Sequence, residues 1–367
     1  MPPDWLNSPS ALPDMFPDDR RADVIIVGYG LAGACLTEML LRKGLRIAVI
    51  DNEKAQTTKV GAGIINPWIF RHLTLSWRVR ELLPFARDFY AATELRTSSK
   101  FVYPLKIMRI FGQDESERWD RVETNGDVHR SKMIDAQKNF PYIKAVFGCG
   151  VIEQSFRVDT ASLLNSLYGL HLGQVHFIRE VFQADKLLIK ESEVVYDHIY
   201  ADSIVFCEGH RAIDNPYFNF IPFRPVKGEL MTILMSGMQE EYIVNRDVFL
   251  LPLGNGLFRL GSTYLWDDLT EEPTEAAARQ LIAGLEKITD LPYSVLSQEA
   301  GIRPAVADRR PVAGCHPEFN RLWILNGLGA RGALIAPWLS HYLANQMRNN
   351  NDPDPEVDPL RFYRNIS

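Results

Sequence analysis

The sequence is short of cysteine and of metal-binding motifs. Its four cysteines, Cys35, Cys149, Cys207 and Cys315, are scattered singly, and no C-x-x-C occurs. Such cysteines indicate reduced thiols in a reducing compartment. The eight histidines are also dispersed, with neither an H-E-x-x-H motif nor a Cys/His cluster. We therefore expect no structural or catalytic metal.

Long apolar runs and an excess of positive charge are missing as well. No stretch reaches the roughly 18 consecutive apolar residues that a membrane-spanning helix needs. Residues 1–20 are rich in proline and acidic side chains and lack the basic start and apolar run of a secretory signal. The formal net charge of −6 gives no overall basic field that would attract nucleic acid. It does not exclude a local basic patch. We expect a cytoplasmic protein without membrane or nucleic-acid partners.

What the chain does contain is enough apolar material for about two domains. It has 367 residues, of which 46% are hydrophobic and 23% charged. Segments with nucleotide-binding character stand near both ends, so a two-domain division must be discontinuous. We predict a cofactor domain and a substrate domain, with the tails outside both. The cofactor domain takes residues 21–75, 145–212 and 296–350, the substrate domain 76–144 and 213–295, and the tails 1–20 and 351–367.

Residues 24–51 read VIIVGYGLAGACLTEMLLRKGLRIAVID. A short buried strand precedes Gly28, Gly30 and Gly33, which have the spacing G-x-G-x-x-G, and a helix and a second strand follow. The first glycine permits the tight turn, the second lets the backbone approach a pyrophosphate, and the third lets the helix pack on the sheet. Asp51 ends the second strand, where a carboxylate accepts hydrogen bonds from a ribose and disfavours the 2′-phosphate of NADP. The stretch predicts a dinucleotide site but does not separate NAD from FAD.

A second strand–glycine–helix unit, ILNGLGARGALIAPWLSHYLA, occupies residues 324–344. A simple NAD domain has no evident use for it. Reduced flavin carries negative charge on the N1–C2=O edge of its ring, and a helix start at about Gly329 to Ala333 would stabilise that charge. The alternative is an ordinary C-terminal helix with a glycine-rich start.

At these residues the chain resembles the D-amino-acid oxidase-like family of FAD-dependent oxidoreductases, which includes glycine oxidase, sarcosine oxidase and the oxidase half of a bifunctional tRNA-modifying enzyme. The segments that carry the resemblance, in the family's order, are VIIVGYGLAGACLTEMLLRKG, RPVKGELMTI, GIRPAVADRRPVAG and NGLGARGALIAPWLSHYLA. The resemblance implies an α/β, Rossmann-like FAD domain beside an α+β substrate domain with a mixed sheet. It also implies non-covalent FAD and transfer of a hydride to flavin from a carbon that bears an amine.

The resemblance also implies which residues form the site. The predicted cofactor-binding residues are Gly28, Tyr29, Gly30, Leu31, Ala32, Gly33, Asp51, Asn52, Gly61, Ala62, Gly63, Val181, Gly209, Gly327, Leu328, Gly329, Ala330, Arg331, Gly332 and Ala333. Arg303 matches the arginine that binds the substrate carboxylate in the family, and the structural alternative is a pair with Asp308. Arg331 contacts flavin or substrate, or braces its own loop. Phe249 stands near the position of the family's substrate-site tyrosine, and Tyr264 is nearby. A phenylalanine in place of that tyrosine weakens the case for glycine or sarcosine as the substrate.

The sequence therefore predicts an FAD-dependent oxidoreductase that acts on the CH–NH or CH–NH2 group of an amino acid or related amine. Oxygen or another electron acceptor would reoxidise the flavin. One alternative is oxidation of a carboxymethylaminomethyl side chain on a tRNA wobble uridine, which is also a secondary amine with a carboxylate. Another is a flavoprotein that holds FAD as a sensor or for structure, without turnover.

Overall fold

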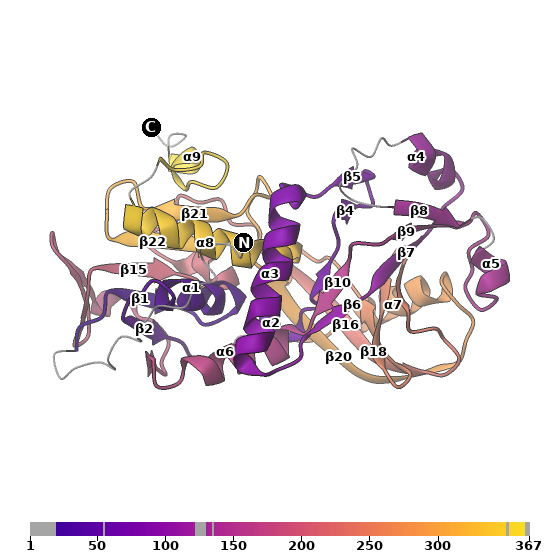
Figure 1. Ribbon diagram of the computed structural model, residues 1–367, viewed down its shortest axis with the longest axis horizontal. Coiled ribbons are helices and arrows are strands. Elements are labelled where there is room, and N and C mark those ends of the chain that lie inside the picture. Colours follow the sequence, from indigo (N-terminus) through magenta and orange to yellow (C-terminus); the bar gives the residue numbers. More distant parts are fainter. Residues whose placement is uncertain (1–19, 54–55, 122–129, 134–135, 350–351, 364–367) are drawn as a thin grey trace.

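The computed structural model describes residues 20–53, 56–121, 130–133, 136–349 and 352–363. Two main sheets organise the molecule, and Figure 1 shows helix α3 (Val79–Thr97) between them. The mixed α/β architecture, with one parallel-type sheet and one mixed sheet, confirms the predicted fold class. In the described part of the chain, no helix is long and apolar enough to cross a membrane.

The first sheet has six strands. In spatial order they are β11 (Val175–Ile178), β2 (Ile47–Ile50), β1 (Val24–Val27), β15 (Ser203–Phe206), β22 (Leu322–Asn326) and β21 (Val312–Cys315). The first five are parallel, and β21 runs antiparallel to β22. Strands β1 and β2 are fully buried runs of aliphatic residues, as expected for parallel strands that are covered on both faces.

Helices cover one face of this sheet and a small antiparallel sheet covers the other. The helices packed on it are α1 (Leu31–Leu41), α6 (Thr160–His171) and α8 (Gly332–Asn349). The small sheet consists of β12 (Leu187–Ile189), β13 (Val194–Tyr196) and β14 (Ile199–Ala201). Successive side chains of β1 point to opposite faces of the sheet. Val24 and Ile26 pack in the core on the helical side, and Ile25 and Val27 pack in the core under the small sheet.

The second sheet has eight strands. In spatial order they are β20 (Tyr293–Arg303), β16 (Val226–Met235), β19 (Leu257–Gly261), β18 (Phe249–Gly254), β17 (Tyr242–Asn245), β7 (Lys106–Ile110), β9 (Cys149–Ile152) and β8 (Arg130–Met133). All neighbours are antiparallel except β17 and β7. One face packs on α7 (Glu275–Glu286), whose Leu281 and Leu285 share a core with Leu250 and Leu260.

Short elements complete the described chain. The helices and 3-10 turns among them are α2 (Gln56–Val60), α4 (Glu115–Arg121), α5 (Ala136–Asn139), η2 (Ala184–Lys186), η3 (Gly209–Asp214), η4 (Gly329–Arg331) and α9 (Leu360–Tyr363). The strands are β3 (Ile64–Ile65), β4 (Trp68–Ile69), β5 (Thr74–Leu75), β6 (Val102–Pro104) and β10 (Phe156–Val158).

The two-domain division stays a prediction, and several helices and strands pack with elements that it assigned to the other domain. β9 and β20 belong to the eight-stranded sheet, although all of β9 and most of β20 were placed in the cofactor domain. Helix α3 was placed in the substrate domain but packs on α8, where the Tyr90 hydroxyl donates to the Ala333 carbonyl at 2.7 Å. The boundaries followed changes in composition, whereas strand pairing and helix packing join segments far apart in the chain.

The C-terminal segment is also less peripheral than predicted. Val357 is completely buried, and its carbonyl accepts a hydrogen bond of 2.9 Å from the backbone N–H of Ala313. The segment therefore docks along β21. The other predicted tail lies almost entirely outside the described residues, which begin at Arg20.

Candidate functional site

A cavity of about 1120 Å³ lies where the two sheets meet. The ends of β1, β2, β15 and β22 contribute Val27, Ile50, Cys207 and Asn326 to its wall. Strands β16, β18, β17 and β20 of the eight-stranded sheet line the opposite side. The site thus sits at the carboxyl ends of parallel strands, the usual position of a ligand in an open α/β sheet.

The first glycine turn is shaped by close backbone contacts. Gly28 has a φ of +94°, and a Cβ there would lie 2.6 Å from the Cys207 carbonyl oxygen. A Cβ on Gly33 would lie 1.9 Å from the Gly28 oxygen, so α1 packs on the turn only because this residue is a glycine. Helix α1 then begins at Leu31, which lines the cavity, so the positive dipole end of the helix faces this space. The Leu31 N–H itself donates to Thr58 Oγ1 at 3.2 Å.

Asp51 fastens this turn from the neighbouring strand. Its Oδ1 accepts from the backbone N–H of Tyr29 at 2.9 Å, and its Oδ2 accepts from that of Glu53 at 2.7 Å. Each carboxylate oxygen has a second lone pair, so Asp51 can still accept from a ribose hydroxyl while it holds the turn.

The second glycine turn opens onto the same cavity. Gly329 has a φ of +56° and donates its N–H to the Pro304 carbonyl at 2.8 Å. The adjoining residues from Leu328 to Leu334 line the wall and include the first turn of α8. The starts of α1 and α8, nearly three hundred residues apart in the sequence, therefore face one space.

Arg303 is a half-buried cation without a carboxylate partner in the described part of the chain. Its guanidinium lies over Gly228, where a Cβ would come within 2.0 Å of Nη2, and 4.4 Å from the ring centroid of Tyr264. Nη1 donates to the Thr263 carbonyl at 3.1 Å, and burial lowers the pKa of the group. Asp308, the alternative partner, pairs instead with Arg361 at 2.9 Å. Arg303 lines the cavity with donors left for an anion.

Arg331 also lines the cavity, but the protein satisfies it. Its guanidinium donates to the Asn66 carbonyl at 3.0 Å, to the Trp68 carbonyl at 3.3 Å and to the Ser76 hydroxyl. Of the two roles that the sequence left open, these contacts match bracing, since they tie the start of α8 to the 66–76 segment.

Most predicted cofactor residues line the cavity. Those that do are Gly28, Gly30, Leu31, Ala32, Asp51, Asn52, Gly61, Ala62, Gly63, Val181, Gly209, Leu328, Gly329, Ala330, Arg331, Gly332 and Ala333, together with the substrate candidates Phe249, Tyr264 and Arg303. Three do not. The Tyr29 hydroxyl contacts His171 Nδ1 at 2.6 Å behind the turn, Gly33 lies against Gly28, and a Cβ at Gly327 would meet Val306. These three residues pack behind the residues that line the cavity.

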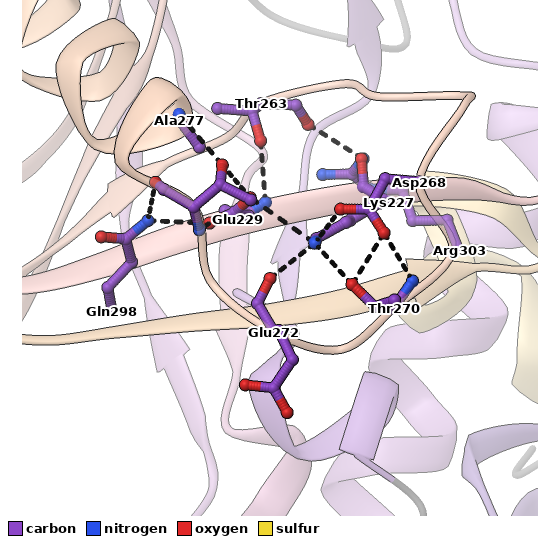
Figure 2. A network of polar contacts seen from close by, with 10 residues as sticks. Lys227, Glu229, Thr263, Asp268, Thr270, Glu272, Ala277, Gln298 and Arg303 are labelled. Carbon is purple, nitrogen blue, oxygen red and sulfur yellow. Dashed lines mark hydrogen bonds and ion pairs between the residues drawn. The ribbon is translucent and has the colours of Figure 1, made fainter.

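Sequence reasoning missed a buried lysine beside Arg303. Lys227 is 0% exposed, and its Nζ donates to Asp268 Oδ2 at 2.6 Å, to Thr270 Oγ1 at 3.2 Å and to the Glu272 carbonyl at 2.5 Å (Figure 2). It ties strand β16 to the segment 262–274, which supplies Tyr264 to the cavity wall. The only trace of this network in the sequence was one lysine in the segment RPVKGELMTI.

Glu229 extends this network on the same strand. Its carboxylate accepts from the Thr274 N–H at 2.8 Å, from the Thr274 hydroxyl at 2.9 Å and from Gln298 Nε2 at 2.7 Å (Figure 2). The Thr274 hydroxyl also caps α7 by accepting from the Ala277 N–H at 3.2 Å. The Glu229 N–H donates to Thr263 Oγ1 at 2.9 Å, so the segment is anchored at both ends.

The residues present fit FAD. The glycine turn and the start of α1 suit a diphosphate, Asp51 suits a ribose, and the start of α8 suits the electron-rich edge of a flavin. The glycines keep clear the space that a Cβ would fill.

Comparison with known proteins agrees with this fit. The sequence pattern of the family described as FAD dependent oxidoreductase matches residues 23–346. Glycine oxidase of Pseudomonas aeruginosa is 23% identical, over 92% of this chain and 97% of that protein. A tRNA 5-methylaminomethyl-2-thiouridine biosynthesis bifunctional protein of Marinobacter nauticus is 22% identical, over 93% of this chain and 59% of its own length. The structure of glycine oxidase from Geobacillus kaustophilus superposes with a TM-score of 0.80 at 19% identity, covering 91% of this chain and 97% of that one.

Proposed function

The chain belongs to the FAD-dependent oxidoreductase family, and on that premise we propose that it oxidises the C–N bond of an amino acid or related amine that carries a carboxylate. The observation that carries the proposal is Arg303. It is a half-buried guanidinium that lines the cavity, with protein carbonyls as its hydrogen-bond acceptors and no carboxylate paired with it among the described residues. A desolvated cation of this kind gains most from a planar anion that accepts two parallel hydrogen bonds.

The proposed cofactor contacts follow from the wall of the cavity. The start of α1 would hold the diphosphate, Asp51 a ribose hydroxyl, and the start of α8 the N1–C2=O edge of the flavin. When bound, FAD supplies the acceptor for a hydride that leaves the substrate carbon. With the ring held in this way, the N–H groups at the start of α8 would face the edge that gains negative charge and would stabilise the reduced form.

The substrate side is built by the protein alone. Arg303 would hold the carboxylate and so fix the position of the neighbouring C–N bond. Tyr264 stacks on the guanidinium and shields it from water, and the segment fastened by Lys227 and Glu229 keeps Tyr264 in place. The amine would enter in its neutral form, because a cationic amine cannot give up a hydride from the adjacent carbon readily.

Oxidation of a tRNA wobble-uridine side chain is the second candidate, favoured by the bifunctional relative. The chain spans only 59% of that protein, and its net charge is −6. Binding of tRNA that weakens steeply with salt would favour this candidate.

The test is anaerobic bleaching of the FAD-loaded protein. We expect the absorbance of oxidised flavin to disappear on mixing with at least one member of a panel of D- and L-amino acids, glycine, sarcosine and proline. A flavin that stays oxidised with every amine and with carboxymethylaminomethyl-uridine would leave the non-catalytic flavoprotein as the better account.

A further inference from the structure

The inner face of the eight-stranded sheet carries a row of cavity residues beyond Arg303. Gly228 on β16 stands under the guanidinium, and Leu230 follows on the same face. Leu230 pairs with Gly261 on β19, Gly261 pairs with Phe249 on β18, and Phe249 pairs with Asn245 on β17. Directly paired residues point to the same side of a sheet. The row therefore leads from Arg303 across two apolar side chains to an amide.

The orientation of the Asn245 amide is fixed from outside the cavity. Arg109 Nη1 donates to Asn245 Oδ1 at 2.8 Å, while Arg109 Nε and Nη2 are held by Glu115 at 2.8 and 3.1 Å. Arginine has only donors, so the amide oxygen must face Arg109 and the amide nitrogen must point the other way. Asn245 lines the cavity, and no described residue accepts a hydrogen bond from its Nδ2.

The spacing of the two polar ends sets the length of a ligand that would use both. From β16, where the guanidinium lies, to β17 there are three strand steps, or about 14 Å at ~4.8 Å per step. The side chains shorten this gap, but glycine or sarcosine cannot bridge it. Leu230 and Phe249 form an apolar floor between the ends.

We propose that Asn245 is a specificity-determining residue that donates to a hydrogen-bond acceptor at the far end of an elongated substrate whose carboxylate is bound by Arg303. The substrate class is then an amino acid or N-substituted amino acid with an apolar middle and a terminal carbonyl, amide or carboxylate. The carboxylate end of this inference rests on the proposed function. The distal end rests on the Arg109–Asn245 contact and the sheet register.

Ligand binding tests this without requiring turnover. Straight-chain carboxylic acids that carry one ketone at increasing distance from the carboxylate, each beside its ketone-free parent acid, are titrated into FAD-loaded protein, and the perturbed flavin absorbance gives Kd. For the chain length that spans the site, we expect the oxo acid to bind about tenfold more tightly than its parent, the value of one well-formed hydrogen bond.

Two variants assign the preference to Asn245. Asn245→Asp keeps an acceptor for Arg109 but replaces the donor in the cavity, and Asn245→Leu removes both. Each should bring the ratio of the two Kd values to about one, while Asn139→Asp, an exposed residue on α5, should leave it at about ten. The ratio cancels the effect of added negative charge on the carboxylate end.

The inference is overturned if no oxo acid is preferred, if the preference survives in both Asn245 variants, or if neither kind of acid binds. It is also overturned if the variants change the flavin spectrum and the FAD Kd but not the ratio, because the amide then serves the cofactor. Failure of the proposed function is separate, since it appears as the absence of bleaching by amines whatever the acids do.

Discussion

Two arginines line the same cavity, and replacing each with leucine should give opposite results. Arg303→Leu removes the donors that are left for a substrate carboxylate, whereas Arg331→Leu removes a brace between α8 and the 66–76 segment. Both side chains are half-buried, and burial lowers the pKa of both. The contrast therefore isolates what each guanidinium contacts.

The magnitudes follow from those contacts. Loss of one partner from a buried, hydrogen-bonded charge pair costs about 3 kcal/mol, so Arg303→Leu should lower kcat/KM for a carboxylate substrate roughly 150-fold. The unfolding free energy of the apoprotein should change by less than about 1 kcal/mol, since the lost carbonyl bond and the stacking on Tyr264 are offset by removal of a desolvated charge. Arg331→Leu strands three acceptors, at about 1 kcal/mol each, and should lower the unfolding free energy by about 3 kcal/mol.

The assays are urea unfolding of the apoproteins, fluorescence titration with FAD, and stopped-flow bleaching with the best amine from the panel. Arg303→Leu should remain yellow with an FAD Kd within about threefold of the wild type. If Arg303→Leu loses FAD or unfolds early while its kcat/KM is unchanged, the carboxylate role is wrong. If the two variants behave alike in all three assays, the reasoning from contacts is wrong as well.

Three further changes test the turn, the anchored segment and the cavity wall. Gly33→Ala places a Cβ 1.9 Å from a backbone oxygen, so FAD should bind more than tenfold more weakly by fluorescence titration, whereas Gly169→Ala, with no atom within 4 Å, should raise the unfolding free energy by about 0.5–1 kcal/mol. Lys227→Met should lower the unfolding free energy by about 3 kcal/mol in urea. Hydrogen bonds from Lys227 and from Thr270 lower the pKa of Asp268 to about 2, so the stabilising contribution of the ionised carboxylate is present above about pH 4 and lost as the pH falls toward 2. Because Lys227 is the largest cause, this acid step should become clearly smaller in the Met variant. Burial raises the pKa of Glu208 to about 7, so its contribution is present below about pH 4 and lost as the pH rises through 7, and Glu208→Gln should abolish that loss in urea midpoints measured across this range.

The features that could be predicted from the sequence are the local ones. The strand, turn and helix of residues 24–41 depend on contacts within a few residues, and the positions of Gly28 and Gly33 are set by backbone geometry. Helix α3 runs from Val79 to Thr97 although it contains Pro84. The proline removes one backbone hydrogen bond, to the Arg80 carbonyl, and the packing of α3 on α8 helps to offset that loss.

The rest of the site depends on long-range pairing that leaves little trace in the sequence. Strand β7 pairs with β17, and this pairing brings Arg109 to Asn245, which lies 136 residues further along the chain. The role of Arg331 could not be chosen beforehand because two of its acceptors are backbone carbonyls, which every residue carries. Lys227 reads as an ordinary strand residue until the 262–274 segment folds over it.

Glycines inside the strands of the second sheet connect the local sequence signals with the long-range contacts. Gly228 leaves room for the Arg303 guanidinium, Gly261 leaves room for Leu230 and Phe249, and a Cβ on Gly301 would press within 3.2 Å of the backbone of Thr57 on α2. Glycine weakens a strand, and its use at paired positions of neighbouring strands marks close approach. Because these three residues carry no side chain, the Arg303 guanidinium can lie flat across the sheet and α2 can approach the sheet closely. The proposed substrate-binding surface is therefore shaped by these glycines as well as by Arg303, the cation that the sequence indicated.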